Sequence, residues 1–170
     1  LEHHIQAEDV DMIHVETTKR GADILSDASK FDPQTKETAD HSLPYVIAAA
    51  VADGNVFPDS FEESKLFDPR IRGLLKKIKV TADPQIDALF PKVKRARVTI
   101  TTKEGQTYCA EVDHAKGSPQ NPMTDADIEN KFMANASHTL STERCKEIID
   151  ATWNFSKIKN VREYCKLLSH

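Results

Sequence analysis

The stretch Lys36-Glu37-Thr38-Ala39-Asp40-His41-Ser42-Leu43-Pro44-Tyr45 runs directly into the apolar sequence Val46-Ile47-Ala48-Ala49-Ala50-Val51. It predicts a helix that starts near Ser42, with the serine hydroxyl as N-cap, because proline is tolerated in a first turn and not in a helix interior. Asp53-Gly54 offers a suitable C-terminal stop. The stretch therefore holds a histidine, a hydroxyl and a phenol at the start of a helix that is apolar enough to be buried.

The composition is that of an ordinary folded protein. The chain has 170 residues, of which 39% are hydrophobic and 29% charged, so we expect one domain or one compact domain with an appendage. The formal charge of −4 is spread along the chain, and the densest basic run, residues 92–97, is short. Its basic residues alternate as on the solvated face of a strand, so nucleic acid is not an expected partner.

The cysteines and the hydropathy indicate the cellular compartment of the protein. Cys109, Cys145 and Cys165 are widely separated and lack C-x-x-C spacing, which argues against a disulfide framework, a zinc site and an iron–sulfur cluster. The pattern assigns no role to any of the three. No window approaches roughly 18 uninterrupted apolar residues and no signal peptide is visible, so we expect a cytoplasmic protein that contacts no membrane. Because the chain starts at Leu1 without methionine, we expect a piece of a longer protein.

Alternating apolar residues predict the strands. They occur near residues 11–17 and 77–81, and as a hairpin of residues 93–102 and 106–112. Short helical segments are expected up to Leu25 and over residues 61–67, 69–76 and 84–90, whereas residues 33–39 read as a short helix or a structured loop.

The chain changes character near residue 118. A loop of Gly, Ser, Pro and Asn leads to Pro122, and three helices follow, opened by Thr124 or Asp125, by Ser141 and near Asn160. The sequence therefore predicts an α+β fold, with a mainly antiparallel sheet of about four strands packed with helices and followed by a helical C-terminal tail. The expected division is residues 1–118 and 119–170.

Several motifs resemble the C-terminal region of the MmgE/PrpD family, whose best-known members are 2-methylcitrate dehydratases. The matching segments, in order, are Asp32-Pro33, Thr38 to Tyr45, Asp53-Gly54, Ile71-Arg72 before Lys77 to Val80, Glu111-Val112-Asp113, and Lys116 to Thr124. The resemblance implies a lyase of small tricarboxylates that needs neither metal nor organic cofactor. It also implies a two-domain fold, in which residues 119–170 join a helical domain formed by preceding sequence that this chain lacks, and a possible homodimer.

The resemblance also implies site residues. Tyr45 falls on the family's active-site tyrosine, and His41 on the histidine of the same motif. Dehydration needs a base, an acid for the leaving hydroxide, and cations or N–H groups that hold carboxylates. The phenol of Tyr45 could be the acid, and we expect it to face a pocket that preceding sequence completes. Ser42 at the helix start and Lys36 could hold carboxylates. The structural alternatives are a boundary tyrosine bonded to backbone, a loop histidine, a capping serine and a surface lysine.

The function expected from the resemblance is that of the C-terminal portion of a 2-methylcitrate dehydratase-like enzyme of propionate metabolism. A related cis-aconitate decarboxylase, an iminodisuccinate epimerase, or a non-catalytic binding or assembly module of the same fold are the alternatives. The family's catalytic lysine and histidine, together with further active-site residues, lie before the start of this chain. We therefore expect these 170 residues alone to be inactive.

Overall fold

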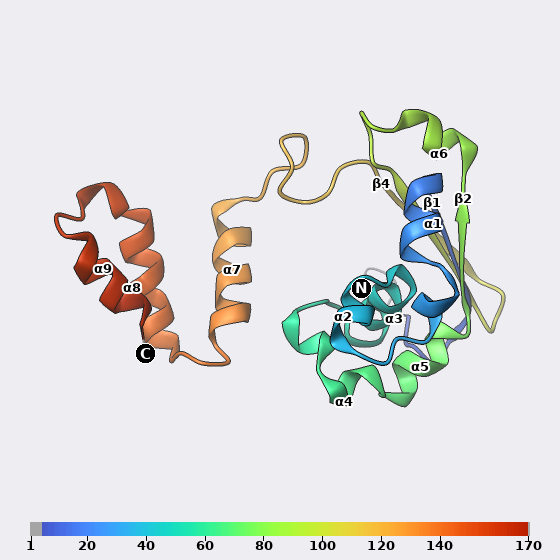
Figure 1. Ribbon diagram of the computed structural model, residues 1–170, viewed down its shortest axis with the longest axis horizontal. Helices are drawn as coiled ribbons and strands as arrows, with labels where there is room; N and C mark the ends of the chain where they lie inside the picture. The colour runs from blue at the N-terminus through green and yellow to red at the C-terminus, as the bar shows by residue number, and fades with distance from the viewer. Residues whose placement is uncertain (1–4, 170) are drawn as a thin grey trace. The chain divides into compact units, whose positions relative to one another are not determined.

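The computed structural model describes residues 5–169 and divides the chain into two compact units, Leu1–Asn121 and Pro122–His170 (Figure 1). The first unit contains the sheet and most of the short helices. In the described part of the second unit, all regular elements are helices. The change of composition expected near residue 118 falls in the loop just before this division.

A four-stranded sheet with the strand order β2-β1-β3-β4 organises the first unit. The strands are β1 (Val10–Thr17), β2 (Ile78–Ala82), β3 (Ala96–Thr102) and β4 (Thr107–Val112). The β1–β3 and β3–β4 pairs are antiparallel, whereas β1 and β2 are parallel and need the long helical crossover between them. The predicted α+β fold with a mainly antiparallel sheet is confirmed, although β3 starts three residues after the predicted residue 93.

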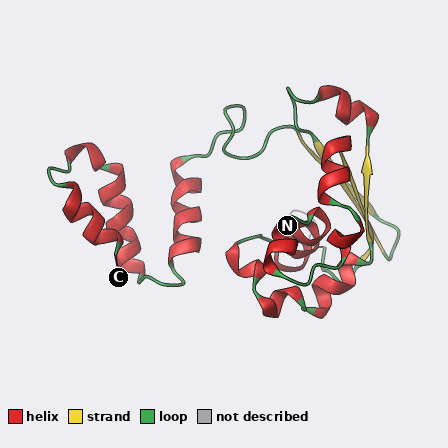
Figure 2. Ribbon diagram, viewed as in Figure 1, coloured by secondary structure: helices red, strands yellow, loops and turns green. Residues whose placement is uncertain are grey.

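The core lies on one face of this sheet. Ile13 is aligned with Ile78 on β2 and with Ile100 on β3, and both Ile13 and Val15 are fully or almost fully buried. Because side chains alternate between faces along a strand, these residues share one apolar side. Helices α3 (Leu43–Asp53) and α5 (Pro69–Leu75) pack against it, so that crossover residues and strand residues form a single core (Figure 2).

The other helical segments of the first unit are short. They are α1 (Lys19–Leu25), η1 (Ala28–Phe31), α2 (Lys36–Asp40), η2 (Pro58–Phe61), α4 (Glu63–Leu66) and α6 (Pro84–Leu89). Residues 33–39 thus contain the short helix rather than only a loop. Among residues 5–169, no helix is both long and apolar enough to cross a membrane.

Helix α3 forms as its sequence predicts. The Ser42 side chain accepts a hydrogen bond from the backbone N–H of Tyr45, and Pro44 sits in the first turn, where its missing N–H costs nothing. At the other end Gly54 has a φ of 76°, the left-handed conformation that glycine adopts most easily. Both ends of the helix are therefore fixed by local sequence.

The second unit consists of α7 (Asp125–Ala136), α8 (Thr142–Trp153), η3 (Phe155–Lys157) and α9 (Val161–Leu168). The Trp153 indole donates a hydrogen bond to Glu129 at 2.7 Å, and the rings of Phe155 and Tyr164 meet edge to face at 5.1 Å. These contacts join the helices to one another. Large apolar side chains remain exposed on this unit, namely Ile128, Trp153, Phe155, Val161 and Leu168.

Candidate functional site

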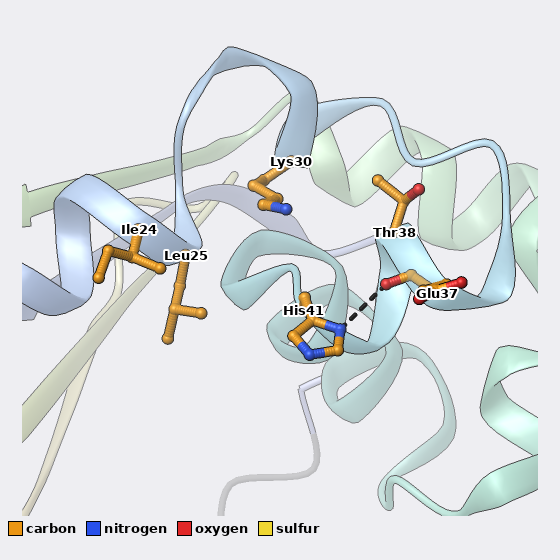
Figure 3. Close-up of a pocket in the computed structure, with 6 residues that line it drawn as sticks. All are labelled: Ile24, Leu25, Lys30, Glu37, Thr38 and His41. Carbon is orange, nitrogen blue, oxygen red and sulfur yellow. Dashed lines mark hydrogen bonds between the residues drawn. The ribbon is translucent and has the colours of Figure 1, made fainter.

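A pocket of about 410 Å³ opens in the first unit, where the ends of α1 and α2 meet η1 (Figure 3). Two of its six lining residues are apolar and four are polar. The lining residues are Ile24, Leu25, Lys30, Glu37, Thr38 and His41. The two apolar side chains lie on one side of the view, and the polar ones come from η1, α2 and the residue that ends α2.

His41 is the residue of this pocket that best suits proton transfer. It is the C-cap of α2, and its side chain is 66% exposed. Its Nδ1 lies 3.1 Å from the carbonyl oxygen of Glu37 and 2.5 Å from Oδ1 of Asp40. The hydrogen bond with the Glu37 carbonyl, and then that with Asp40, raise the pKa of His41 above its ordinary value. The cationic ring is therefore more populated at neutral pH than that of a free histidine.

The other polar groups give the pocket a mixed charge. Lys30 supplies an ammonium group, Glu37 a carboxylate and Thr38 a hydroxyl, which is 2.8 Å from that of Thr35. The apolar wall belongs to the end of α1. Such a pocket suits a small molecule with an anionic group beside the lysine and a hydrocarbon part against the aliphatic side chains.

Ser42 is a structural residue of the site and not part of its surface. It is 1% exposed, and its hydroxyl accepts from the Tyr45 N–H at 3.0 Å and donates to the Lys30 carbonyl oxygen at 2.6 Å. Ser42 is therefore the capping serine that the sequence offered as the alternative to a substrate-binding residue. The second bond joins η1 to the start of α3, and so fixes the backbone of Lys30 relative to His41.

Tyr45 lies in the core, which corrects the expectation that its phenol faces a pocket. The side chain is 0% exposed, and its hydroxyl donates to the Ser60 carbonyl oxygen at 2.7 Å. Its ring is 5.8 Å from that of Phe61. Burial, followed by the nearby Asp53 carboxylate, raises the pKa of Tyr45 to about 12. The phenol is therefore engaged inside the protein and has no open path to a ligand in this arrangement.

The model of the MmgE/PrpD C-terminal domain matches residues 1–155 of this chain. The chain belongs to the MmgE/PrpD family. Two curated relatives are the cis-aconitate decarboxylases of Mus musculus and Homo sapiens, each 29% identical over 136 residues. The match covers 80% of this chain and 28% of each relative, so the chain spans less than a third of their length.

The predicted lysine of this MmgE/PrpD chain is not at the pocket. Lys36 begins α2 on the exposed surface, and it is absent from the pocket lining, whereas Lys30 is part of it. Sequence reasoning missed Lys30 because a residue in a four-residue 3-10 turn carries no motif of its own. Its position depends on the bond from Ser42, which is twelve residues further along the chain.

Within residues 5–169, no group of three or more His, Cys, Asp or Glu side chains is arranged to hold a metal ion. The family resemblance implied chemistry without metal or organic cofactor, and this remains a prediction. The pocket groups that can transfer a proton or carry charge are the side chains of His41, Lys30 and Glu37.

The double role of Ser42 leads to a stability prediction. Ser42→Ala is expected to lower the free energy of unfolding by about 1–3 kcal/mol, because it removes an N-cap and leaves the Lys30 carbonyl unpaired. Thr35→Ala is the matched control, since Thr35 caps α2 on the exposed surface through a longer 3.3 Å bond. Urea unfolding of both variants measures the difference. An equal loss in both would show that the bond from Ser42 to η1 adds nothing.

Proposed function

We propose that this chain forms one wall of the active site of a lyase that acts on a small tricarboxylate. His41 exchanges the proton with substrate, and Lys30 binds a carboxylate. The observation that carries the proposal is that an exposed histidine and a lysine line one pocket in a chain of the MmgE/PrpD family. The family's own catalytic lysine and histidine are expected in preceding sequence, so we propose Lys30 and His41 as further groups of the same two kinds.

The proposed roles follow from the chemistry of two reactions. Dehydration removes a proton from carbon next to a carboxylate, and the electron pair left on that carbon expels hydroxide, which leaves as water after protonation. Decarboxylation breaks a carbon–carbon bond, releases carbon dioxide, and leaves an electron pair that takes up a proton. Both reactions need a group that carries a proton and a cation that stabilises negative charge, and dehydration also needs an acid for the leaving hydroxide, which we propose lies outside this chain. His41 and Lys30 are groups of these two kinds.

The identity of the reaction is part of the proposal. Family resemblance favours dehydration of 2-methylcitrate, whereas the names of the two curated relatives favour decarboxylation of cis-aconitate as a second candidate. The pocket suits either acid, because each combines carboxylates with a short hydrocarbon part that Ile24 and Leu25 can contact.

The rest of the proposed enzyme comes from outside this chain. The pocket holds one lysine among its six lining residues, so the remaining carboxylates of a tricarboxylate need partners elsewhere. Since the relatives are more than three times as long as the matched region, we propose that a helical domain in preceding sequence supplies them. We propose that the complete protein is a cytoplasmic enzyme that forms a homodimer. The 170 residues alone would bind the tricarboxylate weakly and would not turn it over.

The decisive experiment incubates the complete protein separately with 2-methylcitrate and with cis-aconitate, and follows the products by NMR and the carbon dioxide released. Lys30→Met is expected to raise KM about ten- to a hundredfold, as fits the loss of one charge-assisted hydrogen bond. Lys92→Met, on an exposed loop, is the control. Lys36→Met tests the lysine that the sequence favoured. If neither acid gave a product, the non-catalytic module would be favoured. Equal effects of Lys30→Met and Lys92→Met on KM would show that Lys30 does not bind substrate.

A further inference from the structure

One nitrogen of the His41 ring has two hydrogen-bond partners on the protein. Helix α2 ends at Asp40, and the next residue, His41, turns its ring back over the last turn. Its Nδ1 therefore meets both the Glu37 carbonyl oxygen and the Asp40 carboxylate, at 3.1 and 2.5 Å. Among the hydrogen bonds of the described residues, none involves the other ring nitrogen, Nε2.

These partners determine which nitrogen carries the proton in the neutral ring. A carbonyl oxygen and a carboxylate only accept hydrogen bonds, so Nδ1 must be the donor. The single N–H of a neutral imidazole is then on Nδ1, and the lone pair is on Nε2. His41 is one of the lining residues of the pocket in Figure 3, and Nε2 is the basic atom of its ring.

We propose that Asp40 is a positioning residue, which holds His41 in the Nδ1–H form so that Nε2 exchanges the proton with the substrate. The importance of Asp40 for turnover rests on the proposed function, whereas its effect on the tautomer of the His41 ring does not. Asp40 itself is absent from the pocket lining, so it acts on the substrate only through His41.

The proton balance is simple. When Nε2 takes a proton from the carbon next to a carboxylate, the C–H bond breaks and the electron pair expels the hydroxide of the substrate, which takes up a proton from an acid outside this chain and leaves as water. The imidazolium that results carries a proton on each nitrogen, and the Asp40 carboxylate offsets its charge. In decarboxylation the same Nε2–H delivers its proton to carbon after carbon dioxide has left, which returns the ring to the Nδ1–H form.

The charged groups near the ring provide a matched control. They are Asp40, Glu37 and Lys30, and the Lys30 charge opposes protonation of His41. Asp40→Asn and Glu37→Gln each remove one negative charge from this region. Only the first alters a side-chain partner of Nδ1, because Glu37 binds the ring through its backbone carbonyl, which glutamine retains.

The test is the ring-nitrogen NMR spectrum of His41 in the 170-residue chain across a pH titration. We expect the Nδ1–H form to predominate in the unsubstituted chain and in Glu37→Gln. In Asp40→Asn it should lose its predominance, since the amide can present an N–H to Nδ1, and the pKa of His41 should fall. A predominant Nε2–H form in the unsubstituted chain would overturn the proposal, and so would an equal shift in both variants.

Kinetics of the complete protein separate this proposal from the proposed function. Asp40→Asn is expected to lower kcat about ten- to a hundredfold, as is typical when the hydrogen-bond partner behind a functional histidine is lost. The limb of the pH–rate profile that reports His41 should also shift to lower pH. Lower kcat without a change of ring form would contradict positioning by Asp40. A changed ring form with unchanged kcat would instead remove His41 from the reaction and leave the assignment of its tautomer intact.

Discussion

In the complete protein, His41→Gln is expected to lower kcat about 10²- to 10⁴-fold, the range that a positioned general acid or base contributes. Glutamine keeps much of the size and hydrogen-bonding capacity of histidine but cannot carry a proton. The effect should therefore appear in kcat with KM little changed. Steady-state kinetics over a pH series should also show that the limb assigned to His41 disappears.

His14→Gln is the control for this experiment. His14 lies on β1, and its Nε2 forms a 2.8 Å hydrogen bond with the Thr81 hydroxyl on the neighbouring strand β2. It is absent from the pocket lining, so this variant should keep normal turnover. If His41→Gln retained the activity of His14→Gln, His41 would be only a loop histidine, which was the structural alternative for this residue.

The elements with local signals could be predicted from the sequence. Ser42, Pro44 and Gly54 fix the two ends of α3 through capping chemistry that needs no distant partner. Alternating apolar residues identified the β3–β4 hairpin, although the first arm begins later than the pattern suggested. Of the basic run at residues 92–97, only Ala96 and Arg97 lie in β3, and Arg95 and Arg97 pair with Asp113 and Glu111.

The position of Tyr45 could have been recognised from spacing. Tyr45, Ala48 and Ala49 are three and four residues apart, which is one face of a helix, and all three are fully buried. The motif match drew attention to the phenol, but it carries no information about the direction in which the ring points. The spacing places Tyr45 on the buried face of α3, and the tertiary partners Ser60 and Phe61 then hold its hydroxyl and its ring there.

The pocket could not be predicted, because it is made by tertiary contacts. Lys30 and His41 come to line one pocket through a turn, a five-residue helix and one buried hydrogen bond, none of which has a distinctive sequence pattern. Sequence proximity favoured Lys36, which lies nearer to His41 along the chain but on the exposed start of α2. Charged residues near a motif are therefore weaker predictors of a site than the backbone contacts that orient them.

Tyr45→Ala is expected to lower the free energy of unfolding of the first unit by about 3–5 kcal/mol, the usual cost of truncating a buried aromatic side chain. Tyr45→Phe keeps the ring and removes the hydroxyl, which leaves the buried Ser60 carbonyl without its donor and should cost about 1–3 kcal/mol. Urea unfolding monitored by circular dichroism gives both values. A loss near zero for Tyr45→Ala would mean that the ring is not part of the core.

Alkaline pH offers a second test of the same buried phenol. The pKa of Tyr45 is raised to about 12, whereas an unfolded tyrosine titrates near 10. Folding therefore favours the protonated phenol, and the stabilisation that this difference provides is complete below pH of about 10 and is lost as pH rises toward about 12. Tyr45→Phe should accordingly lose stability less steeply over this range than the unsubstituted chain.

Tyr108→Phe is the control for the alkaline series, because the Tyr108 hydroxyl bonds to Gln106 on the surface of the hairpin. It should retain the steep alkaline loss of stability. Ultraviolet absorbance of tyrosinate provides an independent reading, in which Tyr45 ionises only as the first unit unfolds. If Tyr45 instead ionised at its ordinary pKa in the folded chain, its phenol would have access to solvent, and a place for it beside the substrate would again have to be considered.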